Sequence, residues 1–133
     1  MVSDVSSVLA VARQIAASAA FLNIPMFLVD VRGRLEYYND AAGALVGQRF
    51  DEIGPTTLAE RGARWSPTNV EGAPIPLDHF PTMTALRKRR PVHAWLNIAS
   101  LDGARQRLEV SAFPLTDADG ELLGAVGLFW AAT

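Results

Sequence analysis

The side chains that most often carry chemistry are scarce in this 133-residue chain, which has no cysteine and two histidines, His79 and His93. Without cysteine there is no disulfide, thiolate metal site or cysteine nucleophile, and two histidines give poor support to a multi-histidine metal site. Serine and aspartate occur, but no nucleophile elbow, phosphate-binding loop or pair of metal ligands accompanies them. The sequence therefore predicts a protein that is not an enzyme.

Charge and hydropathy argue against two further kinds of partner. The net charge is −2, and the dense basic run from Arg87 to Arg90 is typical of a solvated helix end rather than a phosphate site. No apolar run reaches the roughly 18 residues of a membrane span, and the N-terminus lacks the pattern of a secretory signal. We expect a cytoplasmic domain that binds neither nucleic acid nor a membrane.

An N-terminal helix over residues 1–22 is expected to precede a domain of residues 23–133. Its apolar positions recur at spacings of three and four, which gives one apolar side: Val5, Val8, Ala12, Ile15, Ala19 and Leu22. This seam is too short for a free-standing coiled coil. It can pack on the domain's own sheet or pair with the same helix of a second copy, and the two possibilities are not exclusive.

The next stretch predicts two strands and a capped helix. Met26 to Tyr38 gives two strands around a turn at Arg32-Gly33. Asn39 is a good N-cap for a helix from Asp40 to Val46, and Gly47 is placed to end that helix. Glycines and prolines then interrupt residues 48–76, where we expect short helical turns and loops. A further helix is expected over residues 81–90, with proline in its first position.

The last third of the chain predicts three consecutive strands, from Val92 to Leu101, Arg105 to Leu115 and Leu122 to Trp130. The turns between them contain Asp102-Gly103 and Asp119-Gly120, and Asp-Gly is a strong hairpin signal because both residues accept positive φ. The predicted fold is α+β: a five-stranded antiparallel sheet whose helices are inserted between the second and third strands.

In this order and spacing the chain resembles the PAS domain, a bacterial sensory module. The resemblance covers residues 21–133, and it is carried by the stretch from Ile24 to Gly47 and by the three terminal strands. The matching positions of the first stretch are Asp30, Gly33, Asn39, Ala41 and Gly47. The resemblance implies a sheet that cups a small-molecule pocket and an N-terminal helix that mediates dimerisation.

The resemblance also limits the cofactors. Flavin photosensors of this family form an adduct with a cysteine, and coumaroyl photoreceptors hold their chromophore through a cysteine thioester, so the lack of cysteine excludes both. Haem-binding members use a histidine on the long helix before the third strand, close to where His79 lies. His79 is therefore either a haem ligand or, as we favour, a surface or capping histidine at the start of that helix.

A ligand pocket, if it is open, is expected to be apolar and to suit a fatty or aromatic ligand. The candidate lining residues are Leu45, Trp65, His79, Met83, Leu86, Leu108 and Val110. The alternative is a collapsed pocket that these same side chains fill. Strand alternation puts Trp95 on the opposite face from Leu96 and Ile98. Trp95 and Trp130 are each expected either to fill the core or to cover the outer sheet face under the N-terminal helix.

The function that these expectations support is non-catalytic signal sensing. A homodimer would form through the N-terminal seam and the outer sheet face, and a small apolar ligand or a partner would bias the helix position. Output would pass to an effector protein or to an effector domain of a longer polypeptide. A haem-based gas or redox sensor using His79 and a protein–protein adaptor with a filled pocket are the two alternatives.

Overall fold

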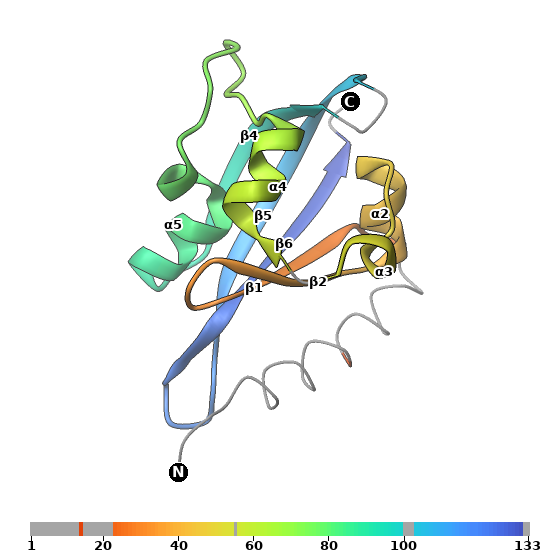
Figure 1. Ribbon diagram of the computed structural model, residues 1–133. Helices are drawn as coiled ribbons and strands as arrows, with labels where there is room; N and C mark the ends of the chain where they lie inside the picture. The colour runs from red at the N-terminus through yellow and green to blue at the C-terminus, as the bar shows by residue number, and fades with distance from the viewer. Residues whose placement is uncertain (1–13, 15–22, 55, 100–102, 132–133) are drawn as a thin grey trace.

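The structure is a computed structural model that describes residues 14, 23–54, 56–99 and 103–131 (Figure 1). Its elements, in chain order, are β1 (Met26–Asp30), β2 (Arg34–Tyr38), α2 (Asp40–Val46), α3 (Phe50–Ile53), β3 (Thr56–Thr57), α4 (Leu58–Trp65), the 3-10 turn η1 (Leu77–His79), α5 (Pro81–Lys88), β4 (Val92–Ala99), β5 (Arg105–Thr116) and β6 (Leu122–Ala131). The predicted N-terminal seam of Val5, Val8, Ala12, Ile15, Ala19 and Leu22 lies outside the described residues.

One antiparallel sheet contains all six strands in the order β3-β2-β1-β6-β5-β4. Strands β4, β5 and β6 form the predicted meander, and β6 then pairs with β1, so that the two ends of the domain meet in the middle of the sheet. The turn between β5 and β6 is the one that Asp119-Gly120 predicted, and Gly120 has a φ of 83°. The other predicted turn, between β4 and β5, begins at Asp102, which lies outside the described residues.

The expectation of five strands was wrong, because a sixth strand, β3, lies at the edge of the sheet. Its two residues pair with β2, Thr56 with Leu35 and Thr57 with Arg34. Two residues are too few to show a period-two pattern, so alternation gives no signal for such a strand. The helical insertion is accordingly divided, with α2 and α3 before β3 and α4, η1 and α5 after it.

The local signals for caps and turns agree with the structure. Asn39 caps α2 through a hydrogen bond that its Oδ1 accepts from the Ala42 amide at 2.9 Å, and Gly47 ends that helix with a φ of 86°. Pro81 occupies the first turn of α5. That helix ends at Lys88, earlier than the expected Arg90, because Arg89 adopts a left-handed conformation with a φ of 53° ahead of Pro91.

The helices cover one face of the sheet, and the strands curve around them (Figure 1). Alternate residues of the central strand therefore enter different clusters. Phe27 and Val29 of β1 pack in the main core with the helices, while Met26 and Leu28 belong to a second apolar cluster on the outer face. The remaining members of that outer cluster are Tyr37, Phe113, Leu115, Val126 and Leu128. The sheet thus carries an apolar cluster on each of its two faces.

Candidate functional site

The inner face brings together six of the seven residues that we expected to line a pocket. Leu45, Trp65, Met83, Leu86, Leu108 and Val110 all belong to the main core cluster between the helices and the sheet. His79 does not join them, because it lies in η1 and is exposed. The position of His79 agrees with a surface histidine, and the other six residues form one continuous apolar environment.

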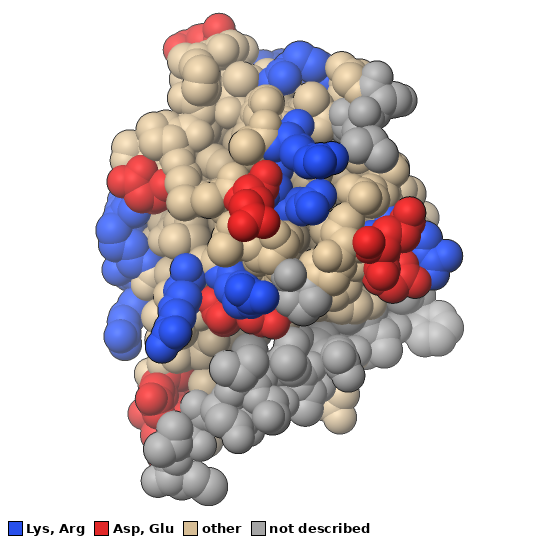
Figure 2. Space-filling view, in the orientation of Figure 1, with Lys and Arg blue, Asp and Glu red and all other residues tan. Residues whose placement is uncertain are grey.

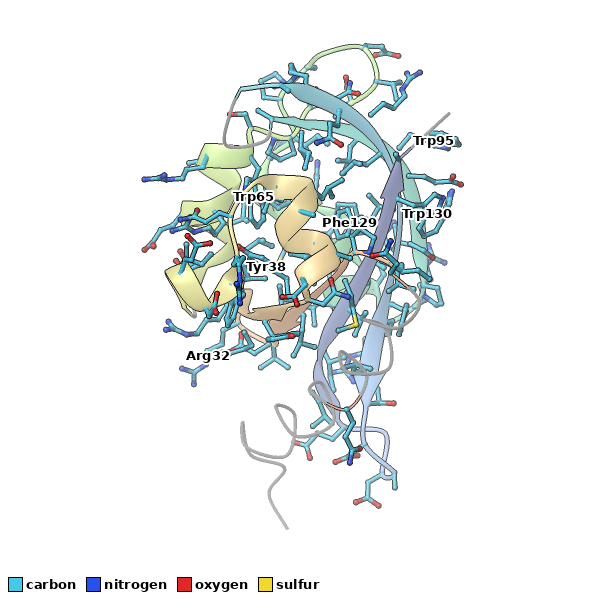
Figure 3. All side chains as sticks on the ribbon, turned by 90° about the vertical axis from the view of Figure 1, so that its right-hand side faces the viewer. Arg32, Tyr38, Trp65, Trp95, Phe129 and Trp130 are labelled. Carbon is cyan, nitrogen blue, oxygen red and sulfur yellow. The ribbon has the colours of Figure 1, made fainter. Side chains whose placement is uncertain are left out.

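Aromatic rings fill much of this environment. The ring of Phe27 lies at the centre, 4.8 Å from Phe129, 5.2 Å from Tyr38 and 5.3 Å from Trp65. The contacts with Trp65 and Phe129 are edge-to-face, the arrangement that the ring quadrupoles favour. Figure 3 shows Tyr38, Trp65 and Phe129 inside the domain, on the helical side of the strands. Phe27, Tyr38 and Phe129 were not among the predicted residues, although each lies in a stretch that was predicted to be a strand.

Tyr38 is the titratable group of this cluster. Its side chain is 1% exposed, and its hydroxyl donates a hydrogen bond to the carbonyl of Gln48, which ties β2 to the end of α2. Burial raises the pKa of Tyr38 to about 12, although the nearby Arg61 guanidinium opposes this rise. Because the folded state resists ionisation of the phenol more than the unfolded state does, stability is lost as the pH rises from the ordinary tyrosine pKa towards the raised one.

Replacing Tyr38 with phenylalanine is expected to make stability less sensitive to alkaline pH. At neutral pH the free energy of unfolding of the variant should be about 1 kcal/mol lower than that of the wild type, because the hydrogen bond to Gln48 is lost. Between pH 10 and about 12 the wild type should lose about 2 kcal/mol more than the variant, because only the wild type has this phenol to ionise on unfolding. Urea unfolding across this pH range measures both differences, and two parallel stability curves would contradict the expectation.

The outer face carries a row of three side chains that crosses three strands. Trp95 on β4 lies opposite Glu109 on β5, and Glu109 lies opposite Trp130 on β6. The indole Nε1 of Trp130 donates a hydrogen bond to Glu109 Oε2 at 2.8 Å. His93 Nε2 lies 2.9 Å from Glu109 Oε1, so both carboxylate oxygens have a partner. We call His93, Trp95, Glu109 and Trp130 the outer-face cluster.

The outer-face cluster is accessible from solvent. Trp95 is 47% exposed and Trp130 37% exposed, and the His93 ring lies 6.4 Å from each indole ring. Figure 3 shows both tryptophans on the opposite side of the strands from Tyr38 and Trp65. This answers the question that strand alternation left open, since neither Trp95 nor Trp130 fills the core. Glu109 was not among the predicted site residues, because only the register of the strands places it between the two indoles.

The charged surface over the helices is mixed. Figure 2 shows acidic and basic side chains side by side across much of this face, with basic side chains gathered over the end of α5. The basic run from Arg87 to Arg90 is exposed there, as expected of a solvated helix end. Among the described residues no group of three or more histidine or acidic side chains could hold a metal ion. No helix in the described part of the chain is long and apolar enough to cross a membrane.

Comparison with solved structures returns domains of the same architecture. A PAS domain from Colwellia psychrerythraea has a TM-score of 0.67 at 16% identity, and the match covers 92% of this chain and 98% of that chain. The PAS domain of Bordetella pertussis BvgS has a TM-score of 0.62 at 18% identity and 92% and 85% coverage. A light-oxygen-voltage domain studied with a flavin analogue has a TM-score of 0.67 at 14% identity and 90% and 85% coverage. These identities show a shared fold and nothing finer.

The sequence itself was also compared with known families. No curated protein matches it. A family model described as the PAS fold matches residues 22–133, which include every described strand and helix from β1 to β6. The strand–turn–strand–helix unit, the inserted helices and the terminal meander all lie within that match. The chain therefore belongs to the PAS family of signal-sensing modules.

Proposed function

We propose that this domain is a non-catalytic signal-sensing module that acts through the outer face of its sheet, where a second copy of the chain docks. The outer-face cluster is the observation that supports this proposal. Two partly exposed tryptophans, Trp95 and Trp130, flank the Glu109 carboxylate in one cross-strand row. Tryptophan is enriched among the residues that contribute most to protein–protein binding, and a row of two gives a rigid apolar surface with a polar centre.

The N-terminal seam is the second surface that we assign to the dimer. Its apolar positions share one side of the expected helix: Val5, Val8, Ala12, Ile15, Ala19 and Leu22. A change in how this helix and the outer face pack against the second copy would be read by an effector protein or an effector domain. The function is therefore binding and relay, and no turnover is involved.

Two kinds of signal are compatible with this module. In the first, a small apolar ligand enters between Leu45, Trp65, Met83, Leu86, Leu108 and Val110. In the second, the core stays filled and the domain is a protein–protein adaptor. The ring contacts of Phe27 with Trp65 and Phe129 favour the adaptor, because they occupy the centre of the same environment. Native mass spectrometry of the purified protein distinguishes the two, since a bound ligand adds its mass to the chain.

Cofactors of related sensors fit this chain poorly. One similar structure is a light-oxygen-voltage domain studied with a flavin analogue. This chain has no cysteine, so it cannot form the cysteinyl–flavin adduct. A haem bound through His79 would need that side chain to enter the core, whereas His79 is exposed in η1. We expect haem added to the wild type or to His79→Ala to keep the Soret spectrum of free haem, because neither protein would ligate it.

Removing the two exposed indoles is expected to weaken the dimer without unfolding the domain. The variants Trp95→Ala and Trp130→Ala should each raise the dissociation constant of the dimer about tenfold or more, as truncation of an interface tryptophan commonly does. Sedimentation equilibrium of the full chain measures this constant. Thermal unfolding should change little, because both side chains are partly exposed in the single chain.

Val31→Ala is the matched control, because Val31 is 50% exposed but lies in the turn between β1 and β2, away from the outer-face cluster. Its dissociation constant should equal that of the wild type. Equal constants for all three variants would mean that the outer-face cluster is not the docking surface. A wild-type chain that stays monomeric at every concentration would refute the homodimer and leave an effector protein as the docking partner.

A further inference from the structure

A groove on the helical side of the domain is separate from the core and from the outer-face cluster. It has a volume of about 360 Å³ and lies between α4 and the segment that leads from α4 to η1. Ala59, Ala63 and Ser66 form one wall, and Pro74, Ile75 and Leu77 form the other. The volume is within the range of small-molecule sites, and most of the lining side chains are apolar. None of the seven residues predicted for the inner pocket lines this groove.

Gly62, which is buried, and Phe80 also line the groove. A Cβ atom at position 62 would lie 2.8 Å from the Phe80 ring, so glycine allows the ring to lie directly against α4. Ile75 and Phe80 also pack against the main core cluster. The groove therefore borders the apolar core, and Leu77, which is 39% exposed, adds accessible apolar area to its lining.

Arg105 lies beside this groove and is hydrogen-bonded to two of its lining residues. Arg105 Nη2 donates hydrogen bonds to the carbonyl of Ser66 at 3.2 Å and to Thr68 Oγ1 at 3.1 Å, and both Ser66 and Thr68 line the groove. Arg105 is exposed, and none of the ion pairs found among the described residues involves it. A guanidinium has five N–H donors, and the hydrogen bonds of Arg105 to described residues all come from Nη2, so the donors on Nε and Nη1 are the ones we assign to a ligand.

We propose that this groove binds a small amphipathic carboxylate, an aromatic or medium-chain acid, with its apolar part between α4 and Leu77 and its carboxylate on Arg105. An apolar groove next to a guanidinium that forms no ion pair among the described residues matches an anion with an apolar tail, since an ion pair with the ligand supplies orientation and the buried tail supplies affinity. A neutral or cationic analogue of the same tail lacks that pair. The proposal does not depend on the dimer.

The position of the groove gives the bound acid a route to the sheet. Thr68 exchanges two backbone hydrogen bonds with Asn97 of β4, each of 2.9 Å, and Asn97 lies two residues from Trp95. A ligand held by Arg105 and the segment from Ser66 to Thr68 would therefore stabilise the backbone that borders β4. Passing this effect along β4 from Asn97 to Trp95 is the one step that rests on the proposed docking role of the outer-face cluster.

Titration of the isotope-labelled full chain with sodium octanoate, octylamine or octanol, followed by amide NMR shifts, tests the proposal. Octanoate should shift the amides of Gly62, Ser66 and Leu77 at lower concentration than either analogue does. Arg105→Gln should weaken octanoate binding about tenfold, as expected for loss of a charge-assisted contact. Ala63→Phe should block the groove, and because Ala63 is exposed on α4 the fold should be retained.

Arg107→Gln is the matched control, since Arg107 is also exposed and lies two residues along β5 from Arg105. It should bind octanoate as the wild type does. The proposal would be overturned if octanoate and octylamine bound equally well, or if the two arginine variants lost the same octanoate affinity. It would also be overturned if octanoate shifted no amide. Shifts confined to Leu108 and Val110 would place the acid in the inner pocket, which would overturn the groove and support the ligand-binding form of the proposed function.

Discussion

Replacing Gly124 with alanine is expected to destabilise the domain strongly, although it adds a single methyl group. Gly124 lies in β6 opposite Asp30 of β1, in the pair of strands that joins the two ends of the domain. An added Cβ atom would overlap the carbonyl oxygen of Val29 and would lie 3.3 Å from its carbonyl carbon and 3.4 Å from Asp30 Cα. These are backbone atoms, which cannot move aside by changing a rotamer.

The expected loss is about 3 kcal/mol of unfolding free energy, or about 10 °C in the midpoint of thermal unfolding, because β1 and β6 must separate to admit the methyl group. Gly127→Ala is the control in the same strand. There the added Cβ atom would lie 2.8 Å from the Phe129 ring and 3.1 Å from Thr82 Cγ2, both side-chain atoms that can shift. The control should lose about 1 kcal/mol. Equal losses in the two variants would show that β1 and β6 do not approach this closely.

The agreement between sequence and structure is best where local chemistry decides the structure. Asn39 and Gly47 bound α2 as expected, because a cap needs only a side-chain oxygen at one end and a positive φ at the other. Strand alternation correctly put Trp95 on the opposite face of β4 from Leu96 and Ile98, which are buried in the main core cluster. These features depend on a few neighbouring residues, so the sequence contains them directly.

Features that depend on distant pairings could not be predicted in the same way. Alternation assigned Trp95 to a face, but only the register of β4, β5 and β6 brings Trp95, Glu109 and Trp130 into one row. That register depends on how many residues each turn uses, and a slip of one residue would reverse the faces. Strand β3 was missed for a related reason, since its two residues become a strand only by pairing with β2.

The candidate site divides in the same manner. The hydrophobic residues of the expected pocket were identified because apolar side chains on the helical face must meet somewhere in the core. The aromatic contacts around Phe27 could not be predicted, because the four rings come from four different elements: Phe27, Tyr38, Trp65 and Phe129. The groove depends on a segment whose path is set by the pairing of Thr68 with Pro74 and with Asn97, and no local pattern predicts such a path.

Replacing Asn39 with alanine is expected to cost more than the loss of an ordinary helix cap. Asn39 Oδ1 accepts hydrogen bonds from the Ala42 amide at 2.9 Å and from the Met26 amide at 3.1 Å, and its Nδ2 donates to the Ile24 carbonyl at 2.8 Å. The side chain is 1% exposed, and Met26 is fully buried. One side chain therefore joins the start of α2 to the start of β1, and its removal leaves buried backbone groups without partners.

The expected loss for Asn39→Ala is about 3 kcal/mol, because the cap itself contributes about 1 kcal/mol and each unsatisfied buried group adds a similar cost. Thr57→Ala is the matched control, since Thr57 caps α4 by accepting one bond from the Glu60 amide at 3.2 Å but is exposed. That variant should lose about 1 kcal/mol. Urea unfolding of the full chain measures both values. If the two variants lost the same free energy, Asn39 would be an ordinary cap, and the junction between β1 and α2 would be held by the backbone bond of Asn39 to the Met26 carbonyl and by core packing.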